Sequence, residues 1–189
     1  MIEDRFVVRR GVSWSEYQRV LEDRGEHSAP RIAYLEGLLE IMSPGETHEK
    51  LNGRIGCLVE TWCLERDIEF ETYGSWTLQD KAVARGVEPD GCYVFGPPRK
   101  ATRPDLAIEV IWTSGSIKKL EIYRKLAVRE MWIWRRGKLN AYVLRGETYE
   151  PVSESDVLPG LDIAQLASVL DRPTASAAIR AYRDLLRKS

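Results

Sequence analysis

The run DLAIEVIW at residues 105–112 constrains the fold more than any other part of this sequence. Its apolar side chains recur at every second position from Leu106 to Trp112, which predicts a β-strand with that face buried. Glu109 lies on the opposite face of the same run. An acid inside a buried strand needs a partner or a cation, because the desolvation of an unpaired carboxylate is costly. The run therefore predicts a covered sheet and makes Glu109 a candidate functional residue.

Strand-length runs alternate with helical runs along the rest of the chain. The predicted strands are two around a turn at Glu36-Gly37 and others at residues 91–95, 131–135 and 138–144. The predicted helices begin at SWSE (13–16), cover residues 48–66 and 117–128, and occur twice within 158–189. This order predicts an α/β or α+β fold with a mixed, mostly antiparallel sheet, and excludes an all-helical bundle. We expect one domain over residues 1–189, with a helix within residues 1–30.

Composition and charge exclude several classes of protein. The chain has 189 residues and no apolar run near eighteen residues, so we expect no membrane-spanning helix. Its net charge of −1 gives no overall positive potential that would attract nucleic acid. The start of the sequence lacks the pattern of a signal peptide, so we expect a cytoplasmic protein. The three cysteines form no CxxC pair, and the two histidines make a zinc site a poor expectation.

Two Pro-Asp pairs offer a partner for Glu109 in a metal site. Asp105 and Glu109 share one strand face but lie four residues apart, about 13 Å at strand rise, which is too far for one small cation. Asp90 stands on another segment, and a hairpin across residues 96–104 brings it beside the centre of the 105–112 strand. We therefore favour Asp90 as the metal partner. The alternative is that Asp90 forms a turn in Pro89-Asp90-Gly91.

Lys119 is the third candidate. On the predicted helix 117–128 it falls inside the apolar arc, whereas Lys118 and Lys125 fall outside it. A lysine directed inward commonly reaches a carboxylate or a phosphate, although one near a helix start can also extend to solvent. Two carboxylates that hold a divalent cation, together with a lysine that orients water or stabilises negative charge, indicate phosphodiester hydrolysis.

Four motifs together resemble one known family. The segments LLEIMSPGETHE, VEPDGCYV, PDLAIEV and KKLEIYRKLAVREMWIW, between about residues 31 and 151, are similar to the Uma-type family of the PD-(D/E)xK nuclease superfamily. The resemblance implies a restriction-endonuclease-like fold, a central mixed sheet flanked by helices, and metal-dependent cleavage of DNA with Mg²⁺ or Mn²⁺. It implies that Asp90 and Glu109 hold the metal. The superfamily lysine is expected two residues after the acid, where this chain has Ile111, and Lys119 is implied as its substitute.

The resemblance also implies an outer part of the site and one departure from the family. Glu40 and His48 correspond to the family's upstream acid and SP…HE segment, although a strand-edge Glu and a helix-start His need no active site. Other members often carry an acid in the loop before the helix, where this chain has TSGSIK. If that acid positions the metal or the lysine, its absence here predicts weak or absent activity.

A cluster of basic residues lies close to these motifs. Eight basic residues between Ile117 and Lys138 are opposed only by Glu121 and Glu130, and phosphate contacts need such a local excess. We predict nucleic-acid contacts by Lys118, Arg124 and Lys125; the alternative is a solvated helix face.

Three functions remain open from the sequence. The first is a metal-dependent DNA endonuclease that uses Asp90, Glu109 and Lys119, and we expect a homodimer because nucleases that cut both strands are frequently dimers. The second is a non-catalytic nucleic-acid-binding or assembly module on the same fold. The third is a protein-binding domain that uses the tryptophan-rich strand at residues 131–135, for which core packing is the alternative.

Overall fold

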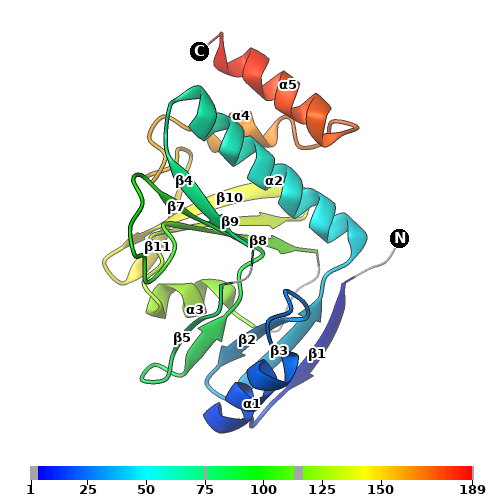
Figure 1. The fold of residues 1–189 in the computed structure, drawn as a ribbon, viewed down its shortest axis with the longest axis vertical. Helices are drawn as coiled ribbons and strands as arrows, with labels where there is room; N and C mark the ends of the chain where they lie inside the picture. Colours follow the sequence, from blue (N-terminus) through cyan, green and yellow to red (C-terminus); the bar gives the residue numbers. More distant parts are fainter. Residues whose placement is uncertain (1–3, 75, 113–116, 189) are drawn as a thin grey trace.

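The computed structural model describes residues 4–74, 76–112 and 117–188, and contains two sheets and five helices within these ranges (Figure 1). The helices are α1 (Trp14–Arg24), α2 (Glu46–Glu65), α3 (Lys119–Lys125), α4 (Ile163–Ala167) and α5 (Ala175–Leu186). None of the described helices is long and apolar enough to cross a membrane. The mixed α/β class and the restriction-endonuclease-like fold are confirmed.

The first sheet has five strands and is antiparallel throughout, in the order β1-β3-β2-β6-β5. Its strands are β1 (Arg5–Arg9), β2 (Arg31–Leu35), β3 (Leu38–Ser43), β5 (Leu78–Asp80) and β6 (Arg85–Val87). The predicted turn between β2 and β3 is present, with Glu36 and Gly37 at φ 45° and 88°. The strand β1 was not predicted, because an exposed five-residue edge strand shows no buried face in its sequence.

The second sheet is the mixed sheet that carries the central strands, in the order β11-β10-β9-β8-β7-β4. Its strands are β4 (Phe70–Tyr73), β7 (Gly91–Phe95), β8 (Leu106–Ile111), β9 (Glu130–Arg135), β10 (Lys138–Arg145) and β11 (Thr148–Val152). Only β8 and β9 pair in parallel among these described strands, and α3 connects them as a crossover helix. The predicted central mixed sheet is therefore this six-stranded sheet. The five-stranded sheet was not predicted as a separate sheet.

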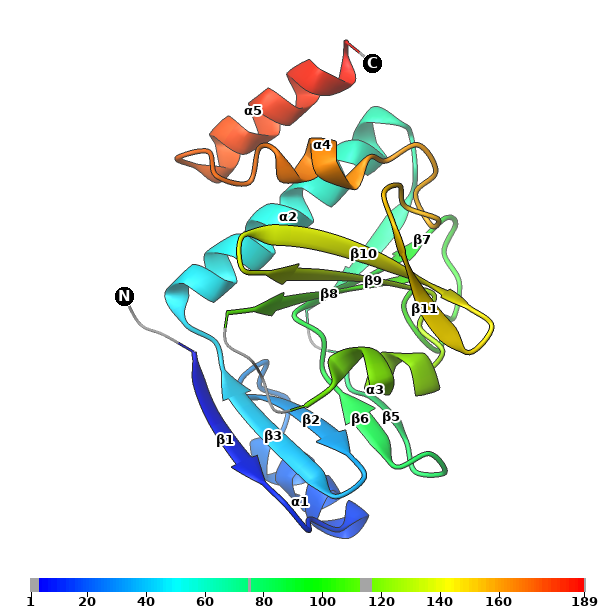
Figure 2. The same cartoon turned by 180° about the vertical axis from the view of Figure 1, so that it is seen from behind.

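Helices cover both faces of the six-stranded sheet. Figure 2 shows α2, α4 and α5 over one face and α3 against the other, between the two sheets. The helix α2 was predicted two residues late, and Ile55, Leu58 and Trp62 are buried on its inner side as expected. The helix α3 is shorter than predicted, because Lys118 lies outside helical geometry and Ala127 has φ 53°.

The tryptophan-rich strand belongs to the core. β9 lies between β8 and β10, and Trp132 and Trp134 pack into the cluster formed with α2, α4 and α5. Trp132 is fully buried and its Nε1 donates to Glu130 Oε1 at 2.6 Å. Trp132 and Trp134 are therefore core residues. The protein-binding alternative required the tryptophans of this strand to contact a partner, and they do not lie on the surface.

The contact between α1 and the first sheet yields a stability prediction. Tyr17 is fully buried, stacks on Tyr34 with ring centroids 4.9 Å apart, and places its hydroxyl where a side chain on Gly86 would begin. A Cβ at position 86 would lie 2.0 Å from Tyr17 Oη and 2.5 Å from its Cζ. We expect Gly86→Ala to lower the free energy of unfolding by roughly 1–3 kcal/mol in urea denaturation, because the rigid ring must move.

Gly53 is the matched control for this substitution. It lies on the exposed side of α2, and a Cβ added there would have no neighbouring atom within 4 Å, so Gly53→Ala adds a methyl group without a clash. We expect Gly53→Ala to raise the free energy of unfolding by up to about 1 kcal/mol, because alanine favours a helix over glycine. Equal effects of the two substitutions would contradict the packing described for Tyr17.

Candidate active site

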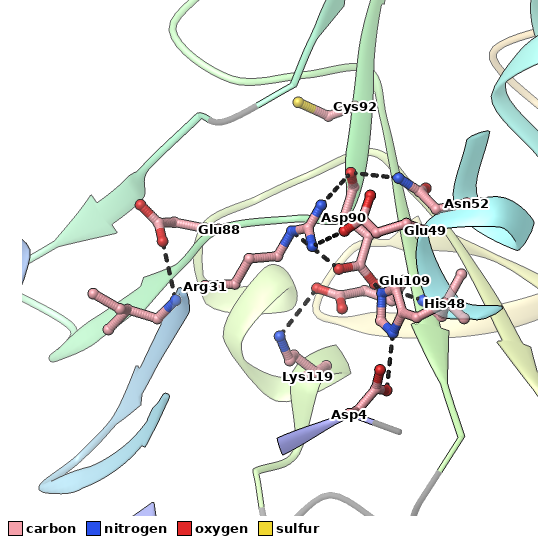
Figure 3. A network of polar contacts seen from close by, with 12 residues as sticks. Asp4, Arg31, His48, Glu49, Asn52, Glu88, Asp90, Cys92, Glu109 and Lys119 are labelled. Atoms are coloured by element: carbon pink, nitrogen blue, oxygen red, sulfur yellow. Dashed lines mark hydrogen bonds and ion pairs between the residues drawn. The ribbon is translucent and has the colours of Figure 1, made fainter. Parts of the chain in front are cut away.

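The pairing of β7 with β8 brings the two candidate metal ligands together. The antiparallel register aligns Gly91 with Ile108, so Asp90, just before β7, lies beside Glu109 in the centre of β8 (Figure 3). Asp90 Oδ2 accepts a hydrogen bond from Val110 N at 2.7 Å, which ties the carboxylate to the neighbouring strand. The hairpin expected across residues 96–104 thus forms and places Asp90 beside Glu109, as expected.

Asp105 lies away from this pair, as its position on the strand indicated. Its Oδ2 accepts from Phe95 N at 2.9 Å and pairs with Arg99 at 2.5 Å, so it closes the loop between β7 and β8. Asp105 is a loop residue in this structure.

Glu109 is held by two side chains of α3. Its Oε1 accepts from Tyr123 Oη at 2.5 Å and lies 3.3 Å from Lys119 Nζ. Lys119 and Tyr123 are four residues apart and therefore share the helix face that packs on β8. The lysine predicted to lie inside the apolar arc does point inward, and its side chain is only 11% exposed.

The electrostatics of this group favour a charged lysine. Burial raises the pKa of Glu109 to about 7, and the neighbouring Asp90 acts in the same direction, while Lys119 and Tyr123 act in the lowering direction. Burial acts to lower the pKa of Lys119, but Glu109, Asp90 and Glu40 outweigh it, so this pKa is raised. Lys119 is therefore a cationic donor, suited to stabilising negative charge.

Asp90 is ionised and surrounded by donors. Burial opposes its charge, but His48, Arg31 and Lys119 lower its pKa. Arg31 Nε lies 3.2 Å from Asp90 Oδ1, and His48 Nε2 lies 3.0 Å from Oδ2. The backbone carbonyl of Asp90 accepts from Asn52 Nδ2 at 2.8 Å and from Arg31 at 3.3 Å. These contacts hold the Asp90 side chain in one orientation.

His48 links Asp90 to the N-terminal segment. Its Nδ1 lies 3.0 Å from Asp4 Oδ2, and Asp4 Oδ1 accepts from Gly45 N, the residue that caps α2, at 2.7 Å. Burial alone would lower the pKa of His48, but Asp90 and Asp4 together raise it to about 9. His48 is therefore an imidazolium at neutral pH and lies between two buried carboxylates.

A pocket of about 460 Å³ opens onto Glu109 and Lys119 between the two sheets and α3. Glu40 of β3 lines it with them, whereas Asp90 and the His48 that pairs with it are absent from its lining. The two residues expected in the outer part of the site thus both reach it, but from different sides. Ile111, which stands where the superfamily lysine is expected, is part of the pocket wall.

The predicted nucleic-acid contacts are dispersed in the structure. Lys118 is exposed and lines the pocket. Arg124 donates to Glu121 Oε1 at 2.8 Å and to the carbonyl of Glu147 at 3.2 Å, so its guanidinium is engaged within the protein. Lys125 is exposed at the far end of α3. Of the three, Lys118 alone borders the pocket among the residues that the structure describes.

Sequence reasoning missed Asp4, Arg31 and Tyr123. Tyr123 was assigned to the apolar arc, where nothing distinguished its hydroxyl from a core contact. Arg31 opens a strand whose following residues are buried, and a charged residue beside a buried run was the signal available. Asp4 carried no local signal. The loop TSGSIK, in which the resemblance implies that other family members often carry an acid, spans residues 113–118, and its residues 113–116 lie outside the described residues.

The comparison with protein families agrees with this architecture. The family model Uma2, described as "Putative restriction endonuclease", matches residues 14–173. The chain belongs to the Uma2 family. No curated protein matches it. The matched segment includes Asp90, Glu109 and Lys119, whereas Asp4 precedes it.

The charged His48 in this Uma2 member yields a pH prediction. Because the folded-state pKa of about 9 exceeds the ordinary value of 6.5, its stabilising effect is complete below pH 6.5 and is lost as the pH rises through 9. In urea denaturation, we expect His48→Gln to cost roughly 2–3 kcal/mol more free energy of unfolding at pH 6 than at pH 9.5. The other histidine, His27, is exposed, and His27→Gln is the control. A pH-independent effect at His48 would contradict the ion pairs.

Proposed function

We propose that this Uma2 member is a Mg²⁺- or Mn²⁺-dependent endonuclease that hydrolyses phosphodiester bonds in DNA. The observation that carries the proposal is the convergence of three groups from different elements. Asp90 lies just before β7, next to Glu109 on the paired strand β8, and Lys119 Nζ lies 3.3 Å from Glu109 Oε1. Glu109 and Lys119 line one pocket. The family's description as a restriction endonuclease supports the same class of reaction.

The residues present are compatible with a hard divalent cation. No group of three or more His, Cys, Asp or Glu suited to a metal occurs in the described ranges, but Mg²⁺ is commonly held by one or two carboxylates, with water and substrate phosphate completing its shell. Asp90 Oδ1 is a buried acceptor without a hydrogen-bond donor among the described residues, although it pairs with Arg31. Asp90 and Glu109 would hold the ion, which supplies Lewis acidity and a more acidic bound water.

Lys119 has the charge and position to act on the phosphoryl group. Hydrolysis forms a bond from a water oxygen to phosphorus and breaks one P–O ester bond, and a proton passes to the departing oxygen. Negative charge builds up on the phosphoryl oxygens, and a buried ammonium group stabilises it. Tyr123 orients Glu109, and Arg31 and His48 orient Asp90. These three are positioning residues.

The second candidate is a catalytically inactive nucleic-acid-binding or assembly module. Its support is that both Asp90 oxygens already face cationic partners, Arg31 and His48, and that Ile111 replaces the expected lysine. This candidate predicts salt-sensitive DNA binding without cleavage, which Glu109→Ala leaves unchanged.

The homodimer is part of the first proposal and follows from cleavage of both strands by two copies. Light scattering coupled to size-exclusion chromatography measures it directly. A mass near the 21.6 kDa of one chain at all concentrations would contradict it.

Cleavage of plasmid DNA with Mn²⁺ or Mg²⁺ tests the endonuclease. We expect Asp90→Asn, Glu109→Gln and Lys119→Met each to lower the cleavage rate at least ~10²-fold, because each removes a group that contacts the ion or the developing charge. Calorimetric titration with Mn²⁺ should show weaker binding to Asp90→Asn and Glu109→Gln, which separates loss of the ion from loss of Lys119.

Two controls match these substitutions in chemistry. Asp105→Asn alters the other Pro-Asp pair, and Lys50→Met alters an exposed lysine on α2, so both should retain cleavage and Mn²⁺ binding. The proposal fails if the wild-type protein at micromolar concentration cuts neither single- nor double-stranded DNA and Glu109→Gln binds Mn²⁺ as well as the wild type does.

A further inference from the structure

Of the two proposed ligands, Glu109 lines a confined pocket, and Asp90 is buried next to Glu109 without lining it. The side chains of Asp90 and Glu109 are 0% and 2% exposed. The pocket that leads to Glu109 has a volume of about 460 Å³, at the lower end of the roughly 300–1,000 Å³ usual for small-ligand sites. A substrate phosphate must therefore pass below the protein surface and enter a pocket about the size of one nucleotide.

An intact duplex is poorly suited to this geometry. Duplex DNA is stiff, with a persistence length of about 150 base pairs, and its stacked pairs keep each phosphate in line with its neighbours. Enzymes that do chemistry on a base inside a closed pocket take single-stranded substrate or extrude one nucleotide, at a cost of a few kcal/mol. The burial of the two acids thus favours a strand that is already unpaired.

The walls of the pocket have the two surfaces that an unpaired strand requires. One wall is apolar and includes Phe6 of β1, Met42 of β3 and Tyr142 of β10. The polar wall carries Glu109 and Lys119. Proteins that bind single strands combine aromatic side chains, on which bases stack, with a groove that contacts the backbone.

Phe6 is placed to be the stacking residue. The register of β1 with β3 aligns Phe6 with Met42 and Val8 with Glu40, and Met42 and Glu40 both line the pocket. Phe6 is 37% exposed, although large aromatic residues are usually more deeply buried. Val7, the next residue, lies on the opposite face of β1 and is aligned with Ile41.

The pocket itself offers little exposed positive charge. Lys118 and Arg135 are the exposed cations that line it within the described part of the chain, and Glu121 lies among them. A protein that contacts about 6–10 phosphates of a duplex needs a larger basic surface than this lining. These two exposed cations can pair with two backbone phosphates, one on each side of a bound nucleotide.

We propose that this pocket takes an unpaired nucleic-acid strand, with a base stacked on Phe6 and the adjoining phosphodiester at Glu109 and Lys119, and that a duplex is cut only where it has locally unpaired. The inference rests on the proposed phosphodiesterase function and specifies its substrate. The preferred substrates are single strands, flaps or extruded nucleotides, and the shared chemistry includes both DNA and RNA.

The test compares one sequence in four forms: single-stranded DNA, the annealed duplex, a duplex with an unpaired flap, and single-stranded RNA. We expect the single strand and the flap to be cut at least ~10-fold faster than the duplex, with cuts in the unpaired segment. Fluorescence anisotropy without metal should show the same preference in binding. The RNA form identifies which single strand is the better substrate.

Phe6→Ala tests the stacking contact, with Val7→Ala as the matched control. We expect Phe6→Ala to raise KM for the single strand about 5- to 100-fold, but to cut the same strand carrying abasic sites as slowly as the wild type does, because an abasic site offers no base to stack. Val7→Ala should change neither value. A general loss of structure in Phe6→Ala would lower cleavage of both strands and is thus distinguishable.

The outcomes separate this inference from the function on which it rests. Equal cleavage and binding of duplex and single strand would overturn the inference and leave the endonuclease intact. Hydrolysis of bis(p-nitrophenyl) phosphate without cleavage of any nucleic acid would likewise overturn it. Binding of the single strand that depends on Phe6, without hydrolysis of any substrate, would support the pocket's preference and contradict the catalytic proposal.

Discussion

The site depends on the burial of two like charges side by side. The hydrogen-bonded pairing of β7 and β8 places Asp90 next to Glu109, both almost inaccessible to solvent, and the charge of Asp90 adds to the burial that raises the pKa of Glu109. Carboxylates in this position are stable only when cationic groups are close. The structure provides Arg31, His48 and Lys119 for this purpose.

These cations come from parts of the molecule that are far apart in sequence, so the same electrostatic requirement connects the two sheets. Arg31 belongs to the five-stranded sheet, His48 to the helix that leaves it, and Lys119 to the helix between the sheets. Asp4 extends the network to the segment before β1 through His48. The site is therefore an interface between the sheets, and its geometry depends on their packing.

Much of the fold was predictable because its signals are local. The capping box of α1, the Glu36-Gly37 turn and the apolar spacing of α2 are each contained within a few residues, and each element formed as expected. The strand β1 was missed because an edge strand is defined by its partner, here β3, and α3 was overextended because apolar spacing does not show where the backbone leaves helical geometry.

The site, like the fold, has some features set by local sequence and others set only by tertiary packing. The sequence by itself determined that Glu109 would be a buried acid, that Lys119 would point inward, and that Asp90 could reach the strand centre while Asp105 could not, because strand and helix periodicity set these directions. Only the tertiary structure decided that Arg31, His48 and Asp4 would surround Asp90, and that Phe6 and Glu40 would border a common pocket. Such contacts depend on how two sheets pack, and no local periodicity encodes the charge balance between segments that meet only on folding.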